Sequence, residues 1–177
     1  MTRSQLTIFA LATMAVAAAP AYVTWKADTT MPKDAPHSSQ AFPVAKTDEE
    51  WQASLTPKRY AVLRRHYTEY PGTSPLLEER RDGTFACAGC GQPLFTADTK
   101  FESGSGWPSF YAAVEGAVGT SEDRTLGARR VEIHCSRCGG HLGHVFPDGP
   151  RPTGQRYCTN GAALIFAPDR TAAENGR

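Results

Sequence analysis

Two short cysteine motifs decide the fold: Cys87-Ala88-Gly89-Cys90-Gly91 and Cys135-Ser136-Arg137-Cys138-Gly139. In each motif a tight turn brings two thiols to face one metal ion, and the glycine after the second cysteine permits the backbone conformation that such a turn needs. Two such turns supply four sulfur ligands, a closed tetrahedral set that suits zinc. Because no coordination position stays open, we expect one structural zinc ion per chain.

Forty-four residues separate Cys90 from Cys135, more than the roughly 15 to 20 of a compact zinc ribbon. The metal would therefore join two distant segments, with a sizeable insertion between them. In an exported protein each Cys-x-x-Cys pair could instead oxidise to a redox-active disulfide. The glycine that follows both pairs favours metal.

The composition of the 177-residue chain is that of a globular protein, with 40% hydrophobic and 21% charged residues. Its 16 glycines and 13 prolines indicate many turns, so we expect a mainly β fold rather than a helical bundle. The 19 basic and 18 acidic residues give a formal charge of +1, which offers no general field for a polyanion. We therefore expect no nucleic-acid partner.

The N-terminal segment is expected to lie outside the folded domain. A basic start, an apolar run and Ala19-Pro20-Ala21 are typical of a secretory signal peptide over residues 1–21. A retained membrane anchor is the alternative, because apolar character continues from Leu6 to Trp25. Residues 22–47, rich in proline and polar side chains, are typical of a flexible linker. We therefore expect the protein to be exported, to the periplasm or the medium, or to be anchored in a membrane through residues 6–25.

One domain is expected over residues 48–169, with a disordered tail over 170–177. Thr56-Pro57 is typical of a helix start, and apolar residues at helical spacing predict a helix over about Pro57–Tyr67. Short β-type runs bounded by turn residues follow. They are Thr84–Ala86, Arg130–His134 and Ala162–Phe166.

The fifth cysteine, Cys158, has no partner once a metal takes the other four. A buried structural thiol is the simpler interpretation, but an unpaired cysteine in an exported chain is a liability unless it is used. His141 and His144 lie upstream and could be metal ligands or proton donors. No third ligand is obvious near them in the sequence, so a Cys158 nucleophile served by histidine proton donors is the better hypothesis.

Several motifs occur in a fixed order between about Glu49 and Ala167. They are Cys-x-x-Cys-Gly, Gly106-Trp107-Pro108-Ser109-Phe110, the second Cys-x-x-Cys-Gly, His141-Leu142-Gly143-His144-Val145-Phe146, Asp148-Gly149-Pro150, Pro152-Thr153-Gly154 and Arg156-Tyr157-Cys158. In this set and order the chain resembles the type B methionine sulfoxide reductases, which act on the R epimer. The resemblance implies a zinc-containing β-tent of two antiparallel sheets with one or two short N-terminal helices, and zinc at the end away from the active site.

The resemblance also implies roles at the matching positions. Cys158 would attack the sulfoxide sulfur and become a sulfenic acid, in the repair of oxidised proteins or peptides under oxidative stress. Proton donation to the oxygen, or its orientation, would come from His141, His144 and Asn160. Trp107, with Phe146, would form the apolar wall that receives the S-methyl group.

Two positions depart from the family pattern. Ser105 stands where many members carry a resolving cysteine, and Gly161 stands where many have serine. The first departure implies an external thioredoxin-like, glutaredoxin-like or small-thiol reductant for a monomeric enzyme. The second could loosen the turn after the nucleophile.

Two interpretations from other classes remain open on the sequence. One is a zinc-stabilised binding module on the same scaffold, with Cys158 idle, and the other is a thiol–disulfide oxidoreductase that uses the Cys-x-x-Cys pairs. A zinc scaffold needs neither Cys158, nor the two histidines, nor Trp107. Their occurrence together therefore favours the reductase.

Overall fold

The structure is a computed structural model that describes residues 42–125, 127 and 129–169. The expected signal or anchor, most of the expected linker and the expected tail lie outside the described residues. Within those ranges no helix is long and apolar enough to cross a membrane. The helices are α1 (Asp48–Ser54) and α2 (Pro57–Arg65), and the strands are β1 (Gly83–Cys87), β2 (Pro93–Thr96), β3 (Lys100–Phe101), β4 (Ser109–Phe110), β5 (Val118–Asp123), β6 (Arg130–Cys135), β7 (His141–Phe146), β8 (Arg156–Thr159) and β9 (Leu164–Pro168).

Both helices begin at side-chain caps that the local sequence encodes. At α1 the Thr47 hydroxyl accepts from the Glu50 N–H, and the Glu50 carboxylate accepts from the Thr47 N–H. Helix α2 starts after Thr56, as predicted, and ends at Arg65 because His66 adopts the left-handed conformation, with φ of 55°. Helix α2 is therefore slightly shorter than the helix predicted over about Pro57–Tyr67, and α1 was not predicted.

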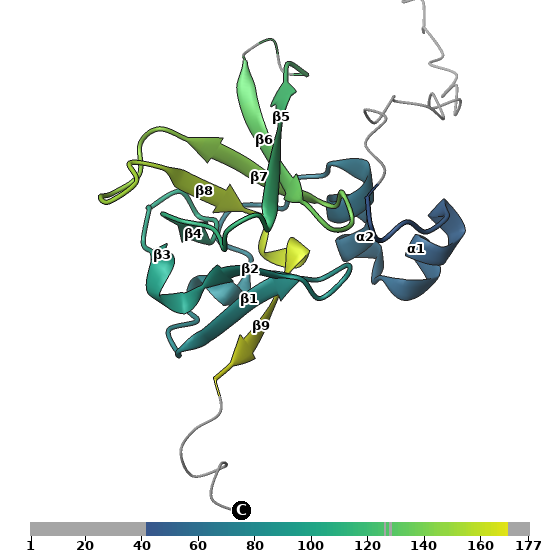
Figure 1. The fold of residues 1–177 in the computed structure, drawn as a ribbon, viewed down its shortest axis with the longest axis horizontal. Helices are drawn as coiled ribbons and strands as arrows, with labels where there is room; N and C mark the ends of the chain where they lie inside the picture. The colour runs from purple at the N-terminus through teal and green to yellow at the C-terminus, as the bar shows by residue number, and fades with distance from the viewer. Residues whose placement is uncertain (1–41, 126, 128, 170–177) are drawn as a thin grey trace, which may run out of the picture. The chain divides into compact units, whose positions relative to one another are not determined.

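The strands form two antiparallel sheets, which confirms the predicted fold class (Figure 1). The smaller sheet has the order β2-β1-β9, and the larger has the order β3-β4-β8-β7-β6-β5. Two of the predicted runs lie within β1 and β6. The third run begins in a 3-10 turn, Gly161–Ala163, and continues into β9.

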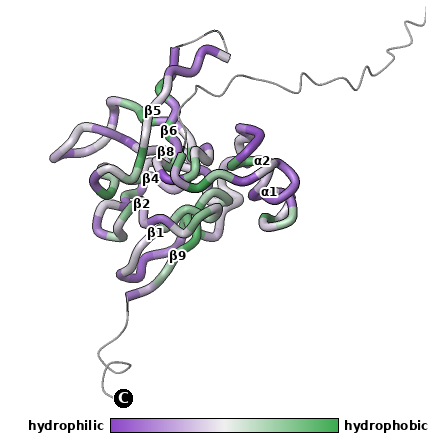
Figure 2. Tube along the Cα trace, turned by 45° about the vertical axis from the view of Figure 1, so that its right-hand side comes forward, coloured by the Kyte–Doolittle hydropathy of each residue, from purple (hydrophilic) through white to green (hydrophobic). Residues whose placement is uncertain are grey.

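Aromatic side chains from both sheets form the centre of the core. Phe95 of β2 stacks on Phe110 of β4 with ring centroids 4.3 Å apart, and Phe85 of β1 meets Phe110 edge-on at 5.0 Å. All three rings are fully buried, so they join the smaller sheet to the larger. Trp51 and Leu63 pack the two helices onto the same core. By contrast, Figure 2 shows a hydrophilic outer end of the β5–β6 hairpin.

The packed chain begins earlier than the expected boundary at residue 48. The Val44 N–H donates to the Arg137 carbonyl at 2.8 Å. The Phe42 ring covers Gly139 so closely that a Cβ there would lie 2.3 Å from a ring carbon. The described end of the expected linker therefore lies against the second cysteine motif, because an apolar ring and a backbone donor find partners there.

Candidate active site and metal centre

The four motif cysteines converge from the ends of β1 and β6 and the turns that follow them. The Sγ atoms of Cys87 and Cys138 are 3.7 Å apart, those of Cys90 and Cys135 are 3.6 Å apart, and all four lie within 4.8 Å of one another. A tetrahedral zinc site with four Zn–S bonds of ~2.3 Å has edges of about 3.8 Å. The donor set therefore fits a tetrahedral metal ion.

Both cysteine turns have the backbone that the sequence predicts. Gly91 and Gly139 have φ of 74° and 68°, in the left-handed region. Each donates its N–H, at 2.8 Å, to the carbonyl of the first cysteine in its own motif. Because β1 and β6 belong to different sheets, a metal in this cluster would tie the two sheets together.

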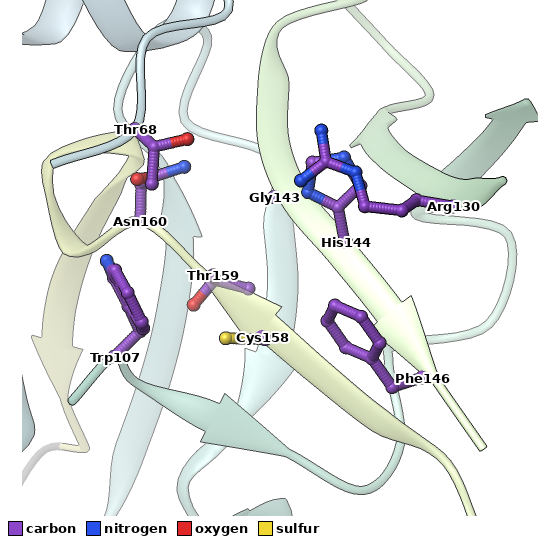
Figure 3. Close-up of a pocket in the computed structure, with 9 residues that line it drawn as sticks. All are labelled: Thr68, Trp107, Arg130, Gly143, His144, Phe146, Cys158, Thr159 and Asn160. Carbon is purple, nitrogen blue, oxygen red and sulfur yellow. The ribbon is translucent and has the colours of Figure 1, made fainter. Parts of the chain in front are cut away.

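Cys158 borders a cavity of about 130 Å³ (Figure 3). The cavity is lined by Thr68, Trp107, Arg130, Gly143, His144, Phe146, Cys158, Thr159 and Asn160. In Figure 3 the Cys158 sulfur lies between the rings of Trp107 and Phe146, so it has an apolar wall on each side. The structure thus brings together every predicted catalytic and substrate-binding residue except His141.

Strand register places His144 beside the thiol. His144 of β7 is directly opposite Cys158 of β8, and Ser109 of β4 is opposite Cys158 on the other side. Directly opposed residues of an antiparallel pair project to the same face of the sheet. The strands also approach closely, since a Cβ at Gly143 would lie 2.1 Å from the Cys158 carbonyl oxygen. Glycine between the two histidines is therefore a steric requirement.

An ion-paired network on β5 and β6 holds the His144 ring. Nε2 of His144 lies 2.8 Å from Asp123 Oδ2, and Arg130 binds the same oxygen. The N–H and hydroxyl of Thr125 donate to the other Asp123 oxygen, at 2.9 and 2.7 Å. These bonds, with smaller contributions from His144 and Arg130, hold the pKa of Asp123 well below its usual range. Burial lowers the pKa of His144, the Asp123 carboxylate opposes that shift, and Arg130 adds to it.

His141 belongs to a second network, whose residues do not line the cavity. Its ring is buried, and its Nδ1 lies 2.7 Å from Glu132 Oε1, which His66 Nδ1 approaches at 3.0 Å. Burial alone would raise the pKa of Glu132, but hydrogen bonds from His141, His66 and Ser121 hold it well below its usual range. The ring centroids of His141 and His144 are 5.7 Å apart. His141 therefore lies beside His144 but does not line the cavity.

The sequence showed no third metal ligand near His141 and His144, but the structure brings two possible ligands next to His141. Ligand atoms of His66, Glu132 and His141 lie within 4.8 Å of one another, so they could hold a metal ion. His144 is outside this group. A metal site that uses both histidines of the motif is therefore not what the geometry favours.

The segment that contains Glu69 fixes both Asn160 and Trp107. Asn160 Oδ1 accepts from the Glu69 N–H at 3.0 Å, and its Nδ2 donates to the Leu142 carbonyl at 3.1 Å. Trp107 Nε1 donates to the Glu69 carbonyl at 3.0 Å. The Glu69 carboxylate in turn accepts from the Gly161 N–H. The Glu69 segment therefore holds Asn160 through its side chain and Gly161 through its backbone N–H.

Ser105 and Arg156 flank the thiol. Ser105 Oγ is 3.8 Å from Cys158 Sγ. Arg156 makes two hydrogen bonds of 2.8 Å to Asp148 and lies 4.5 Å from the centre of the Phe146 ring. Asp148 is the main reason that the pKa of Arg156 is raised, and Cys158 contributes to the same shift. A positive charge thus lies on the thiol's side of β8.

Sequence reasoning missed Asp123, Arg130 and Thr68. For β6 a signal was present, because charged and apolar residues alternate from Arg130 to Ile133, which places the charged side chains on one face. Asp123 and Thr68 carry no comparable local signal. Each lies on a segment that is distant in the sequence from the site residues that it contacts.

Known proteins resemble this chain over nearly the whole described domain. The SelR domain profile matches residues 55–168. Relatives named peptide methionine sulfoxide reductase MsrB are 55% identical in Leifsonia xyli subsp. xyli, over 72% of this chain and 94% of that protein, and 55% identical in Leptospira interrogans, over 71% and 96%. The relative of that name in Agrobacterium fabrum is 52% identical over 71% of this chain and 93% of its own. Among solved structures, the "Yippee-like" domain of Mis18 aligns with a TM-score of 0.43 and 19% identity, covering 51% of this chain and 100% of that domain.

The matched residues 55–168 include both cysteine motifs and every residue that lines the cavity. The relatives are enzymes of a single named activity, which favours the reductase over a binding module with an idle Cys158 and over thiol–disulfide exchange at the cysteine motifs. The chain therefore belongs to the SelR-domain family of MsrB-type peptide methionine sulfoxide reductases, enzymes that reduce methionine sulfoxide.

Proposed function

We propose that this enzyme reduces the R epimer of methionine sulfoxide, by preference in oxidised proteins, with Cys158 as the nucleophile. The observation that carries the proposal is the Cys158 thiol, which lies between two aromatic rings and directly opposite His144. Methionine sulfoxide presents an apolar methyl group, an electrophilic sulfur and a polar oxygen, so its site needs an aromatic wall, a thiolate and a proton donor. Two aromatic rings, the Cys158 thiol and the His144 imidazole line the cavity, which supports this assignment.

In the proposed reaction the Cys158 thiolate attacks the substrate sulfur while His144 gives a proton to the sulfoxide oxygen. The attack forms a bond between Cys158 Sγ and the substrate sulfur. The S–O bond of the substrate then breaks as the oxygen, with its proton, moves to Cys158 Sγ, and the S–S bond breaks with its electron pair on the substrate sulfur. The substrate sulfur gains two electrons and becomes methionine, and Cys158 becomes a sulfenic acid. We assign the donor role to His144 because it lines the cavity, whereas His141 does not.

An external thiol regenerates the enzyme in this proposal. The Ser105 hydroxyl lies 3.8 Å from Cys158 Sγ, and the other four cysteines lie together in the proposed metal cluster. One reductant thiol displaces water from the sulfenic acid to give a mixed disulfide, and a second thiol then displaces Cys158. A thioredoxin-like protein, a glutaredoxin-like protein or a small thiol can supply both.

Zinc is the metal that we propose for the cluster, held by Cys87, Cys90, Cys135 and Cys138. Four thiolates at these distances suit its size and its tetrahedral preference. With four protein ligands the ion has no open position for a substrate, so it contributes stability to the fold.

The mature enzyme is proposed to act as a monomer outside the cytoplasm, either released or anchored through residues 6–25. The basic start and apolar run of the N-terminus support this. N-terminal sequencing of the mature protein from a cell envelope fraction and from the medium tests it. Processing near residue 21 supports a signal peptide, an intact N-terminus in membranes supports an anchor, and an unprocessed cytoplasmic protein contradicts both.

Separated R and S epimers of a methionine sulfoxide peptide test the function directly. With no reductant present, we expect the full-length enzyme to release about one equivalent of methionine peptide from the R epimer and none from the S epimer. Cys158→Ser should release none, since a hydroxyl is a far poorer nucleophile than a thiolate. Exclusive reduction of the S epimer would refute the epimer assignment, and a full equivalent from Cys158→Ser would refute the nucleophile.

A further inference from the structure

We propose that Asp123 is a positioning residue for the reaction, which holds the His144 imidazole in one orientation and one tautomer, and that Arg130 acts on the same ring through its charge. This inference rests on the proposed role of His144 as proton donor. Asp123 lies across the hairpin from Arg130, at the far end of β5 from the cysteine motifs. Nothing in its local sequence marks it as part of the site.

The carboxylate of Asp123 is itself rigidly held. Its Oδ1 accepts two hydrogen bonds from Thr125, and its Oδ2 faces both His144 Nε2 and the Arg130 guanidinium. The side chains of Asp123 and His144 are only 13% and 12% exposed, so water competes little for these contacts. A carboxylate fixed in this way can hold an imidazole ring in a single orientation.

The contact also determines which ring nitrogen is free to exchange a proton with the substrate. An ionised carboxylate only accepts hydrogen bonds, so Nε2 of His144 must carry a hydrogen. In the neutral ring the lone pair is then on Nδ1, and the imidazolium carries its second, deliverable proton there. Asp123 thus fixes Nδ1 as the donor atom. It also supplies the counter-charge that a largely buried imidazolium needs.

Charged and titratable groups lie near His144 on every neighbouring strand. Asp123 comes from β5, Arg130 and Glu132 from β6, His141 from β7 and Cys158 from β8. The Asp123 carboxylate raises the pKa of His144, whereas Arg130 and His141 lower it, alongside the larger effect of burial. Neutralising Asp123 and neutralising Arg130 should therefore move the pKa of His144 in opposite directions. A general loss of structure would not produce shifts of opposite sign.

Histidine-labelled full-length protein, loaded with zinc, provides the test. Long-range 1H–15N spectra across pH, recorded in the Cys158→Ser background to remove thiol titration, report both the tautomer and the pKa of His144. We expect the neutral ring to carry its hydrogen on Nε2. Asp123→Asn should lower the pKa of His144 and mix its tautomers, and Arg130→Gln should raise the pKa. Glu122→Gln is the matched control, because it removes a more exposed carboxylate from the adjacent position of the same strand.

Single-turnover methionine release in the Cys158 enzyme completes the test. Asp123→Asn should slow the release about tenfold or more, and Glu122→Gln should leave it unchanged. An unchanged tautomer and pKa of His144 in Asp123→Asn would overturn the inference. If His144→Ala is slow while Asp123→Asn releases methionine at the normal rate, the positioning role is wrong and the donor role stands. If both variants react at the normal rate, the donor role in the proposed function is wrong as well.

Discussion

At the scale of single residues, Gly161 and Ser74 show how closely two positions distant in the sequence pack together. A Cβ at Gly161 would lie 1.9 Å from the Ser74 hydroxyl and 2.5 Å from the Ser74 Cβ. Ser74 has a task of its own, since its hydroxyl accepts from the Leu76 N–H at the start of the 3-10 turn Pro75–Leu77. Ser74 and Gly161 therefore fit one another as a pair.

The pair predicts a non-additive response to substitution. Gly161→Ser should lower the free energy of unfolding by about 1–3 kcal/mol, because it overpacks a buried site. Adding Ser74→Gly should recover part of that loss, although Ser74→Gly alone removes a cap and should also destabilise. Urea unfolding of the two single variants and the double variant measures the coupling. Strictly additive losses would show that the two residues do not share this space.

At the scale of elements, strand β6 carries the Glu132 carboxylate between two histidines. The pKa of Glu132 is lower in the folded protein than in the unfolded chain, so its ionised form stabilises the fold. That stabilisation is complete above the ordinary glutamate value of about 4.3 and is lost as the pH falls through the lower folded value.

Glu132→Gln should therefore make stability less dependent on pH in the acid range. Urea unfolding between pH 3 and pH 7 should show a smaller decline below about pH 4.3 than in the unchanged protein. Glu122→Gln serves as control, since its carboxylate is more exposed and both proteins lose bound metal alike in acid. Parallel curves for Glu132→Gln and the unchanged protein would contradict the assigned role of Glu132.

The cysteine turns link β1 and β6, two strands that belong to different sheets. Cys135→Ser should release the metal and lower the free energy of unfolding by at least about 5 kcal/mol, because metal binding contributes directly to folding. Activity should fall with it, since β6 pairs with the strand that carries His144. Metal content and thermal unfolding measure this, with Cys158→Ser as a control that keeps its metal. A metal-free Cys135→Ser protein with normal stability and turnover would refute the prediction.

Local signals predicted part of this arrangement, and strand pairing determined the rest. Thr56-Pro57 marks the start of α2 by cap chemistry alone, and the glycines after each cysteine pair mark the turns. The capping box Thr47-x-x-Glu50 was equally local, and it is the signal that α1 needed. The register that sets His144 opposite Cys158 depends on how two strands pair, which neither strand encodes by itself.

The two histidines of the motif illustrate the limit of spacing as a guide. Residues three apart in a regular strand project to opposite faces. The pairing of β6 with β7 also shifts register between Ile133 and His134, beside His141. For both reasons, spacing in the sequence could not assign His141 and His144 to the same cavity.

At the scale of the whole molecule, the distribution of sulfur predicts how the enzyme is recycled. One equivalent of substrate should consume one thiol of the reduced, zinc-loaded protein and leave a trappable sulfenic acid on Cys158, with the metal retained. Mass spectrometry with a sulfenic-acid trap counts the thiols. Loss of two thiols with a disulfide from Cys158 to another cysteine would refute the prediction.

Ser105→Cys should convert this outcome into an internal disulfide. The Ser105 hydroxyl already lies 3.8 Å from the thiol, so a sulfur there has only a short distance to close to the ~2.05 Å of a disulfide bond. The variant should lose two thiols per substrate in the same assay. If it still loses one, the loop holds position 105 in an unsuitable direction.

Phe42 and Val44 pack on the second cysteine turn, so the protease sensitivity of the chain around them should depend on whether metal is bound. While the turn keeps its shape, the chain around Lys46 is held, and Lys46 itself lies 4.7 Å from the centre of the Trp51 ring. Removing the metal with a chelator should loosen this stretch and speed tryptic cleavage after Lys46, and Phe42→Ala should do so even with metal bound. Equal cleavage rates with and without metal would contradict this. In a membrane-anchored form, metal starvation would then cause shedding, because a protease that cuts this stretch would release the catalytic part from its anchor.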